Sequence, residues 1–273
     1  MRIIPVIDLM AGQVVRGVAG RREEYRPIKS PLCGSSQPAD VARALVERFG
    51  FDELYVADLD AIAGHEPAWH VYRGLAAHVP RLMIDAGVRD AKQAARLADF
   101  ALKTATLTTP IPTKAATKAE PTTRNEPCGV AAIVAGLESL ASPRVLAEIL
   151  SVVGQQRLVF SLDLKLGQPL NDSPGWRGLD AWGVACTARE IGVRRTIVLD
   201  LARVGMHGGV GTEELCQRLR DADPGMEIIG GGGVRGADDL RSLAAAGCDG
   251  ALVASALHDG RLSAMDVGRW LAM

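Results

Sequence analysis

Short apolar runs alternate with helix-like segments along the whole chain of 273 residues. Eight apolar runs occur, at residues 3–7, 54–57, 82–84, 130–135, 158–162 and 196–199, directly before Gly230, and at residues 251–254. Alternating strands and helices predict an α/β fold with a parallel sheet. Eight such units favour a closed (β/α)8 TIM barrel over the alternative, a doubly wound open sheet. A barrel places its active site at the carboxyl ends of its strands, so the residues after each run are the first candidates.

The two halves of the chain resemble each other. The segment I-D-L-M-A-G-Q at residues 7–13 matches L-D-L-K-L-G-Q at residues 162–168. This repeat predicts two half-barrels, in which the first and fifth strands face each other across the mouth. Asp8 and Asp163 would then point into one cavity from opposite sides, as an acid and a base acting on one substrate require.

Four consecutive glycines at residues 230–233 separate the seventh apolar run from a helical pattern at residues 237–246. Glycine allows a tight turn and a close approach of the backbone to a ligand. A helix N-terminus beside it offers free N–H groups to an anion. The pattern predicts a phosphate cradle, and its alternative is a tight turn that binds nothing.

Composition limits the partners and the compartment. The formal net charge is -1, so neither a nucleic acid nor a membrane surface is an expected partner. The five cysteines are scattered without a C-x-x-C pair, which indicates reduced thiols and neither a disulfide framework nor a metal site. The N-terminal apolar run is too short for a signal peptide, and we expect a cytoplasmic protein.

One segment interrupts the pattern. Residues 103–127 are rich in Thr, Ala, Pro and Lys and show no hydrophobic period. We expect a low-complexity surface insertion between the third helix and the fourth strand of a single barrel domain, residues 1–273. The segment is either a tolerated insertion or a lid.

Several motifs occur in one order along nearly the whole chain. They are I-P-V-I-D-L-x-x-G-x-V-V-R-G at residues 4–17, V-A-D-L-D at 56–60, L-D-L-K at 162–165, and G-G-G-V-R followed by A-L-V-A-S-A-L-H-D-G near the end. In these motifs the chain resembles the histidine-biosynthesis barrels of the HisA/HisF family, and the HisA isomerase branch fits best.

The resemblance implies an Amadori-type isomerase that converts an aldose to a ketose on a small phosphorylated metabolite, with no metal or redox cofactor. By position it makes Asp8 and Asp163 the acid–base pair, which handles the sugar C2 proton and the ring oxygen. It also implies that Trp176 stacks on a substrate ring, and the alternative for Trp176 is a loop anchor. The residues that match a phosphate cradle are Gly231, Gly232, Gly233, Ala254 and Ser255.

The first half of the chain departs from the family pattern. The family binds two phosphates, but Asp85-Ala86-Gly87 replaces one of its glycine triplets, and a carboxylate beside a phosphate is unfavourable. We therefore expect a divergent paralogue whose sugar or aminosugar substrate carries a single phosphate. The alternatives are lyase or synthase chemistry in the synthesis of a one-carbon carrier of the tetrahydromethanopterin type, and a non-catalytic barrel that binds a phosphometabolite.

Five further residues each keep more than one interpretation. Lys165 binds a substrate anion or forms an imine, or it is a solvated lysine. Arg16 reaches the ligand from the first loop, or it is a surface arginine. Asp85, Asp200 and His207 are candidates for altered specificity. Their alternatives are a helix cap for Asp85, a hydrogen-bonding rim residue for Asp200 and a loop residue without a role in chemistry for His207. The sequence does not determine the oligomeric state.

Overall fold

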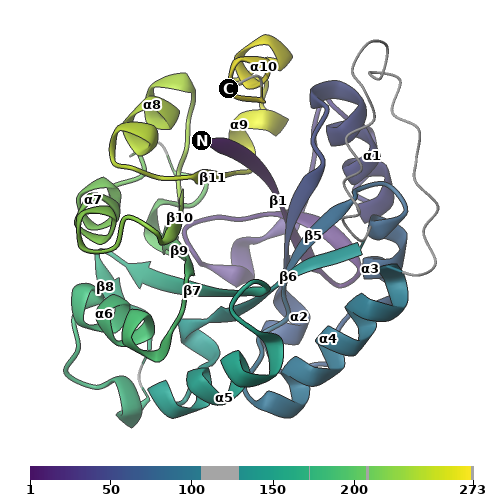
Figure 1. Ribbon diagram of the computed structural model, residues 1–273. Coiled ribbons are helices and arrows are strands. Elements are labelled where there is room, and N and C mark those ends of the chain that lie inside the picture. The colour runs from purple at the N-terminus through teal and green to yellow at the C-terminus, as the bar shows by residue number, and fades with distance from the viewer. Residues whose placement is uncertain (106–128, 172, 207–208, 272–273) are drawn as a thin grey trace, which may run out of the picture.

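Eight parallel strands close into a barrel in the computed structural model, which describes residues 1–105, 129–171, 173–206 and 209–271 (Figure 1). The strands pair in chain order, and the last pairs with the first, so the sheet has no open edge between them. This arrangement confirms the (β/α)8 barrel and excludes the open sheet. The barrel strands are β1 (Arg2–Met10), β4 (Glu53–Asp58), β5 (Arg81–Asp85), β6 (Gly129–Gly136), β7 (Leu158–Lys165), β9 (Arg195–Asp200), β10 (Glu227–Gly231) and β11 (Gly250–Val253).

Helices surround the barrel as an outer ring. They are α1 (Pro38–Phe49), α3 (Trp69–Ala76), α4 (Ala91–Ala105), α5 (Pro143–Val153), α6 (Ala181–Ile191), α7 (Glu213–Ala222), α8 (Ala237–Ala245) and α10 (Ala264–Leu271). Two short helices, α2 (Leu59–Ile62) and α9 (Ser255–His258), follow strands at the barrel mouth. The short strands β2 (Gln13–Arg16) and β3 (Arg26–Pro27) extend the end of β1, and β8 (Gln168–Pro169) extends that of β7.

The expected insertion at residues 103–127 starts inside a helix, because α4 continues to Ala105. The remainder of that segment lies outside the described residues. The helix that follows the next strand begins as the sequence predicts. Pro143 occupies its first turn, and the Ser142 hydroxyl accepts a hydrogen bond from the Val145 amide at 3.4 Å.

Side chains alternate between the barrel interior and the helix layer, as the period of a strand requires. Ile4, Tyr55, Met83, Val159 and Ile229 belong to one buried apolar cluster, which fills the interior. Their chain neighbours belong to a second cluster, which packs against the helices. Position along a strand therefore decides whether a residue can reach the pocket at the barrel mouth.

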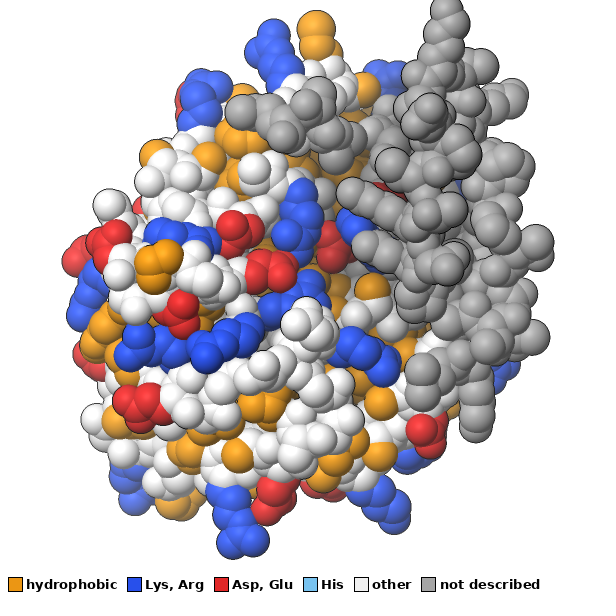
Figure 2. Space-filling model, viewed as in Figure 1, with side chains coloured by type: hydrophobic (Ala, Val, Ile, Leu, Met, Phe, Trp, Pro, Cys, Tyr) orange, Lys and Arg blue, Asp and Glu red, His pale blue; other side chains and the backbone are white. Residues whose placement is uncertain are grey.

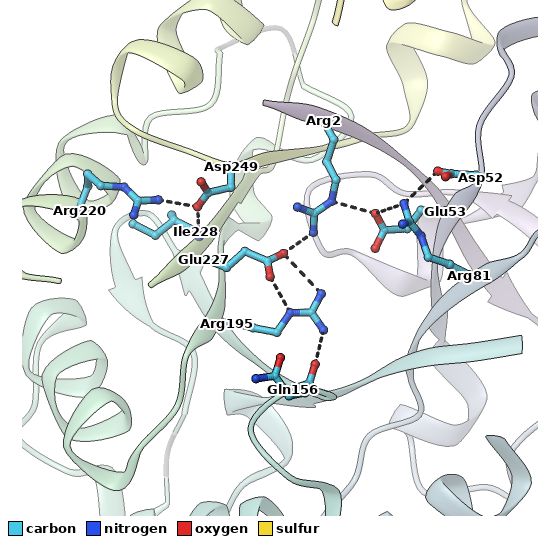
Figure 3. Close-up of polar contacts among 10 residues, drawn as sticks. All are labelled: Arg2, Asp52, Glu53, Arg81, Gln156, Arg195, Arg220, Glu227, Ile228 and Asp249. Carbon is cyan, nitrogen blue, oxygen red and sulfur yellow. Dashed lines mark hydrogen bonds and ion pairs between the residues drawn. The ribbon is translucent and has the colours of Figure 1, made fainter. Parts of the chain in front are cut away.

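Charged side chains gather at the amino end of the barrel and form ion pairs there (Figure 3). The Arg2 Nε lies 2.9 Å from a Glu53 oxygen, and Arg2 also pairs with Glu227. The Arg195 Nε lies 2.7 Å from the other Glu227 oxygen. Basic and acidic side chains accordingly lie side by side at the centre of the face in Figure 2. These charged side chains line a hollow of about 790 Å³ at the amino end of the barrel.

Four described cysteines are free thiols, namely Cys33, Cys186, Cys216 and Cys248, and Cys128 lies outside the described residues. Among the residues that the structure describes, no helix has both the length and the apolar character needed to cross a bilayer. The same residues contain no group of three or more His, Cys, Asp or Glu side chains placed to hold a metal ion.

Candidate active site

A cavity of about 420 Å³ lies at the carboxyl ends of the strands. Its floor is apolar and includes Val6, Ala57 and Leu252, whereas its wall carries several ionisable groups. The acidic groups come from opposite sides of the barrel, because β1 and β7 are separated by β4, β5 and β6. The charged side chains that line the cavity are Asp8, Arg22, Glu23, Asp85, Glu138, Asp163 and Lys165.

Asp8, Asp85 and Asp163 form the uppermost interior layer of their strands. Each lies an even number of residues after an interior side chain of its own strand, such as Ile4, Met83 or Val159. The barrel strands therefore bring three carboxyl groups to the cavity, where the sequence repeat predicts two. A Cβ placed on Gly136 would lie 3.2 Å from an Asp163 oxygen and 3.4 Å from an Asp85 oxygen, so these two carboxyl groups converge over a bare backbone.

Burial makes all three carboxyl groups harder to ionise. It raises the pKa of Asp8 to about 6, although the nearby positive charge of Arg22 opposes the change. It raises the pKa of Asp85 to about 7, although a hydrogen bond from the Gly87 amide opposes it. Burial, with the negative charges of Glu138 and Asp85, holds the pKa of Asp163 well above the usual range. At neutral pH the site thus contains both ionised and protonated carboxyl groups.

Two tyrosines lie among these acids. The Tyr55 hydroxyl donates to an Asp85 oxygen at 3.3 Å. Burial and the charges of Asp85, Asp163 and Asp8 hold the pKa of Tyr55 well above its ordinary value. Burial and the charge of Asp8 raise the pKa of Tyr25 to about 12. Both phenols therefore stay protonated and act as hydrogen-bond donors.

The first loop folds across the mouth of the barrel. The Arg22 guanidinium lies 2.8 Å from a Glu138 oxygen, which joins the loop after β1 to the turn after β6. The Ala19 amide donates to the Val204 carbonyl at 2.8 Å on the far side. These contacts narrow the entrance and place the Arg22 charge close to Asp8.

Gly232 and Gly233 line the cavity at the end of β10 with φ of +87° and +92°. A Cβ on Gly232 would lie 2.7 Å from the Asp200 carbonyl oxygen, and one on Gly233 would lie 2.8 Å from the Arg203 carbonyl oxygen. Only glycine fits this geometry, and its bare backbone faces the cavity beside Ala254 and Ser255. Gly231 is not among the residues that line the cavity, and a Cβ on it would lie 3.0 Å from the Leu252 side chain.

The structure does not bring every candidate residue to the cavity. Lys165 lines it, but Arg16 pairs with Asp259 and borders only an adjoining space of about 30 Å³. The Asp200 carboxylate faces the loop after β7, where it accepts hydrogen bonds from the Leu166 and Gly167 amides at 3.1 and 2.9 Å. His207 lies outside the described residues.

Trp176 is buried away from the cavity and does not have the position that stacking on a substrate would require. Its indole N–H donates to the Leu140 carbonyl at 3.0 Å, and its ring stacks on Phe160 with centroids 6.2 Å apart. Only 3% of its surface is exposed. The arrangement corresponds to the alternative for this residue, an anchor that fixes the loop after β7.

We expect Trp176→Phe to lower the free energy of unfolding by about 1–3 kcal/mol, because it removes one buried hydrogen bond and leaves a small cavity. Binding of inorganic phosphate should stay unchanged. Chemical denaturation and calorimetric titration measure the two quantities. A large loss of ligand affinity without a loss of stability would contradict the anchor and restore the stacking role.

Sequence reasoning missed Tyr55, Arg22 and Glu138. The alternation of β4 could have identified Tyr55, which lies two residues before Ala57 on the interior face. The same alternation separates Asp85 and Asp163 from Asp200, which follows the interior residue Leu199 and so faces away from the cavity. Arg22 and Glu138 lie in loops, where no period exists to place them.

Known proteins resemble this chain in both halves of the barrel. A family model described as "Histidine biosynthesis protein" matches residues 2–126 and 117–263, which is one match for each half. An uncharacterized protein of Methanocaldococcus jannaschii is 30% identical over 267 residues, with 98% of this chain and 97% of the relative covered.

Two further relatives are named 1-(5-phosphoribosyl)-5-((5-phosphoribosylamino)methylideneamino)imidazole-4-carboxamide isomerase. A protein of Thermus thermophilus is 30% identical over 266 residues, with 96% of each chain covered. The protein of Alkaliphilus metalliredigens is 27% identical over 274 residues, again with 96% of each chain covered. The similarity thus spans the whole barrel.

Proposed function

We propose a function from one premise: the chain belongs to the histidine biosynthesis protein family, as a divergent HisA-like member. The proposed function is an Amadori-type isomerase that converts an aldose to a ketose on a sugar or aminosugar with a single phosphate. One observation carries it. Asp8 and Asp163 enter the same cavity from opposite strands, and both carboxyl groups titrate above the ordinary aspartate range.

The two carboxyl groups have different chemical roles because they differ in how readily they ionise. The pKa of Asp8 is about 6, so Asp8 is ionised at neutral pH and can accept the sugar C2 proton. Burial holds the pKa of Asp163 well above the usual range, which favours the protonated form that can donate to the ring oxygen. Ring opening requires a proton donor, and the enolisation that follows requires a proton acceptor. The two carboxyl groups provide one of each.

Charge supports a substrate with one phosphate. The substrate in the names of the isomerase relatives carries two phosphoribosyl groups. In this chain the glycine side of the cavity, at Gly232 and Gly233, offers bare backbone to one anion. The opposite side carries Glu138, which Arg22 neutralises, and Asp85, which has no ion pair and disfavours a second phosphate.

Solvent exchange at C2 tests the proposal. The protein is incubated in D2O with singly phosphorylated aldoses and their N-glycosylamines, and proton NMR follows the C2 signal. We expect loss of that signal and the appearance of ketose with at least one of these compounds. Exchange with none of them, in protein that still binds inorganic phosphate, would instead favour a non-catalytic barrel.

We expect Gly232→Ala to weaken binding of inorganic phosphate by about tenfold or more, because the Cβ forces the backbone away from the Asp200 carbonyl. The matched control is Gly50→Ala at the end of α1. That glycine also has a positive φ, +76°, but nothing lies within 4 Å of its Cβ position. Equal phosphate affinity in the two variants would rule out the cradle.

Lys165 supports a second candidate, a lyase or synthase that forms an imine. Its side chain lines the same cavity, two residues after Asp163. Borohydride added with a carbonyl substrate would attach that substrate to Lys165 only in this second case. Mass spectrometry of the treated protein therefore separates the two mechanisms.

A further inference from the structure

The cavity has two chemically different sides. One is formed by glycine backbone and small side chains, including Gly232, Gly233 and Ala254, and bears no charge of its own. The other is formed by Asp85, Asp163 and Glu138, at the ends of β5, β7 and β6. A ligand that spans the cavity therefore meets bare backbone at one end and carboxyl groups at the other.

The aspartates on the acidic side form no ion pair among the described residues, although Arg22 and Lys165 line the same cavity. Arg22 pairs instead with Glu138. Asp85 is 6% exposed, as is Asp163. Among the described residues their hydrogen bonds come from neutral donors. These are the Tyr55 hydroxyl and the Gly87 amide for Asp85, and the Ser161 hydroxyl and the Glu138 backbone amide for Asp163. Buried carboxyl groups of this kind are unfavourable unless a cation accompanies them.

The two aspartates also converge. One oxygen of each lies within 3.4 Å of a single point beside Gly136, which has no side chain to occupy the space between them. A group that donates several hydrogen bonds and carries a positive charge satisfies both oxygens at once. A primary ammonium has three donors and one charge. A hydroxyl has one donor and no charge, so it leaves one carboxyl group uncompensated.

We propose that Asp85 and Asp163 form a subsite for a protonated primary amine of the ligand, opposite the glycine side that holds its phosphate. The ligand class is thus a phosphorylated amine, with the two charges at opposite ends of the cavity. This inference rests on the proposed function only in taking the glycine side as the phosphate site. Asp85 carries the charge that pairs with the amine and so determines specificity, whereas Asp163 accepts a hydrogen bond from the amine through one oxygen and keeps its proton on the other for transfer to the ring oxygen.

Matched probes test the subsite without turnover. They are ω-aminoalkyl phosphates and ω-hydroxyalkyl phosphates of graded chain length, titrated calorimetrically into the full chain. At the best-fitting length we expect the amine to bind about 10- to 100-fold more tightly than the alcohol, as charge-assisted hydrogen bonds imply. Asp85→Asn should abolish this preference and leave the affinity for inorganic phosphate unchanged. The control Asp238→Asn, whose carboxylate is on the surface, should retain it.

Three results would overturn the subsite: equal affinity for amine and alcohol, a preference that survives Asp85→Asn, or no binding of any aminoalkyl phosphate. The results that would refute the proposed isomerase differ from those that would refute the subsite. If the amine preference holds and no aldose exchanges its C2 proton, the subsite stands and the isomerase does not. If exchange occurs and the preference is absent, the isomerase stands and the subsite does not.

Discussion

Asp8→Asn and Asp163→Asn should each reduce C2 proton exchange by about 10²–10⁴-fold, the usual contribution of a positioned acid or base. Asn has nearly the shape of Asp but neither accepts nor donates a proton at neutral pH. Because the two groups act on different atoms of one substrate, loss of either should stop the reaction. Exchange rates by proton NMR, with a phosphorylated aldose that the wild type converts, provide the measurement.

Binding separates a chemical role from a structural one. Both variants should bind inorganic phosphate as the wild type does, because neither aspartate lies at Gly232 or Gly233. Asp238→Asn is the control, since its side chain is 88% exposed and pairs only with Arg241 on the surface of α8. Full activity in both Asp8→Asn and Asp163→Asn would refute the proposed mechanism.

The pH profile gives the same assignment a second test. If Asp8 is the base, activity should rise with pH through about 6, where its carboxyl group ionises. Replacement of Arg22 by Ala should shift this rise in activity to higher pH, because the Arg22 charge lowers the pKa of Asp8. If the activity of the Arg22→Ala variant rises at the same pH as that of the wild type, another group is the base.

Much of the fold follows from the sequence because its signal is periodic. Apolar runs predict the eight strands, and the match between residues 7–13 and 162–168 predicts that Asp8 and Asp163 face each other. The glycine run predicts a position where no Cβ fits, which Gly232 and Gly233 occupy. In each of these cases the information is local or repeats along the chain.

The rest of the site depends on contacts between distant segments. Nothing near Trp176 in sequence indicates that its indole bonds to the Leu140 carbonyl and packs on Phe160. The pairing of Arg22 with Glu138 joins residues 116 positions apart. The Asp200 carboxylate accepts hydrogen bonds from amides of the loop after β7 and does not face the cavity. Such contacts are decided by how loops meet at the barrel mouth.

Asp85→Asn should make the protein more stable at neutral and alkaline pH, by up to about 4 kcal/mol. The Asp85 pKa rises from 3.8 in the unfolded chain to about 7 in the folded protein, so the folded state binds more protons between these values. The stability that Asp85 contributes is therefore complete below pH 3.8 and is lost as the pH rises through 7. Asn has no charge to bury, so the advantage of the variant should grow over this window and then level off.

Urea denaturation of wild type and variant across this pH range measures the difference. Asp239→Asn provides a control of opposite sign, because its hydrogen bond with Arg235 lowers the pKa of Asp239. That variant should lose stability at neutral pH and approach the wild type as the pH falls. An Asp85→Asn variant less stable than the wild type at alkaline pH would show that the Asp85 charge is compensated within the free protein. The proposed amine subsite requires that the Asp85 charge has no partner in the free protein. The Asp85→Asn variant should therefore both gain stability and lose the preference for the amine.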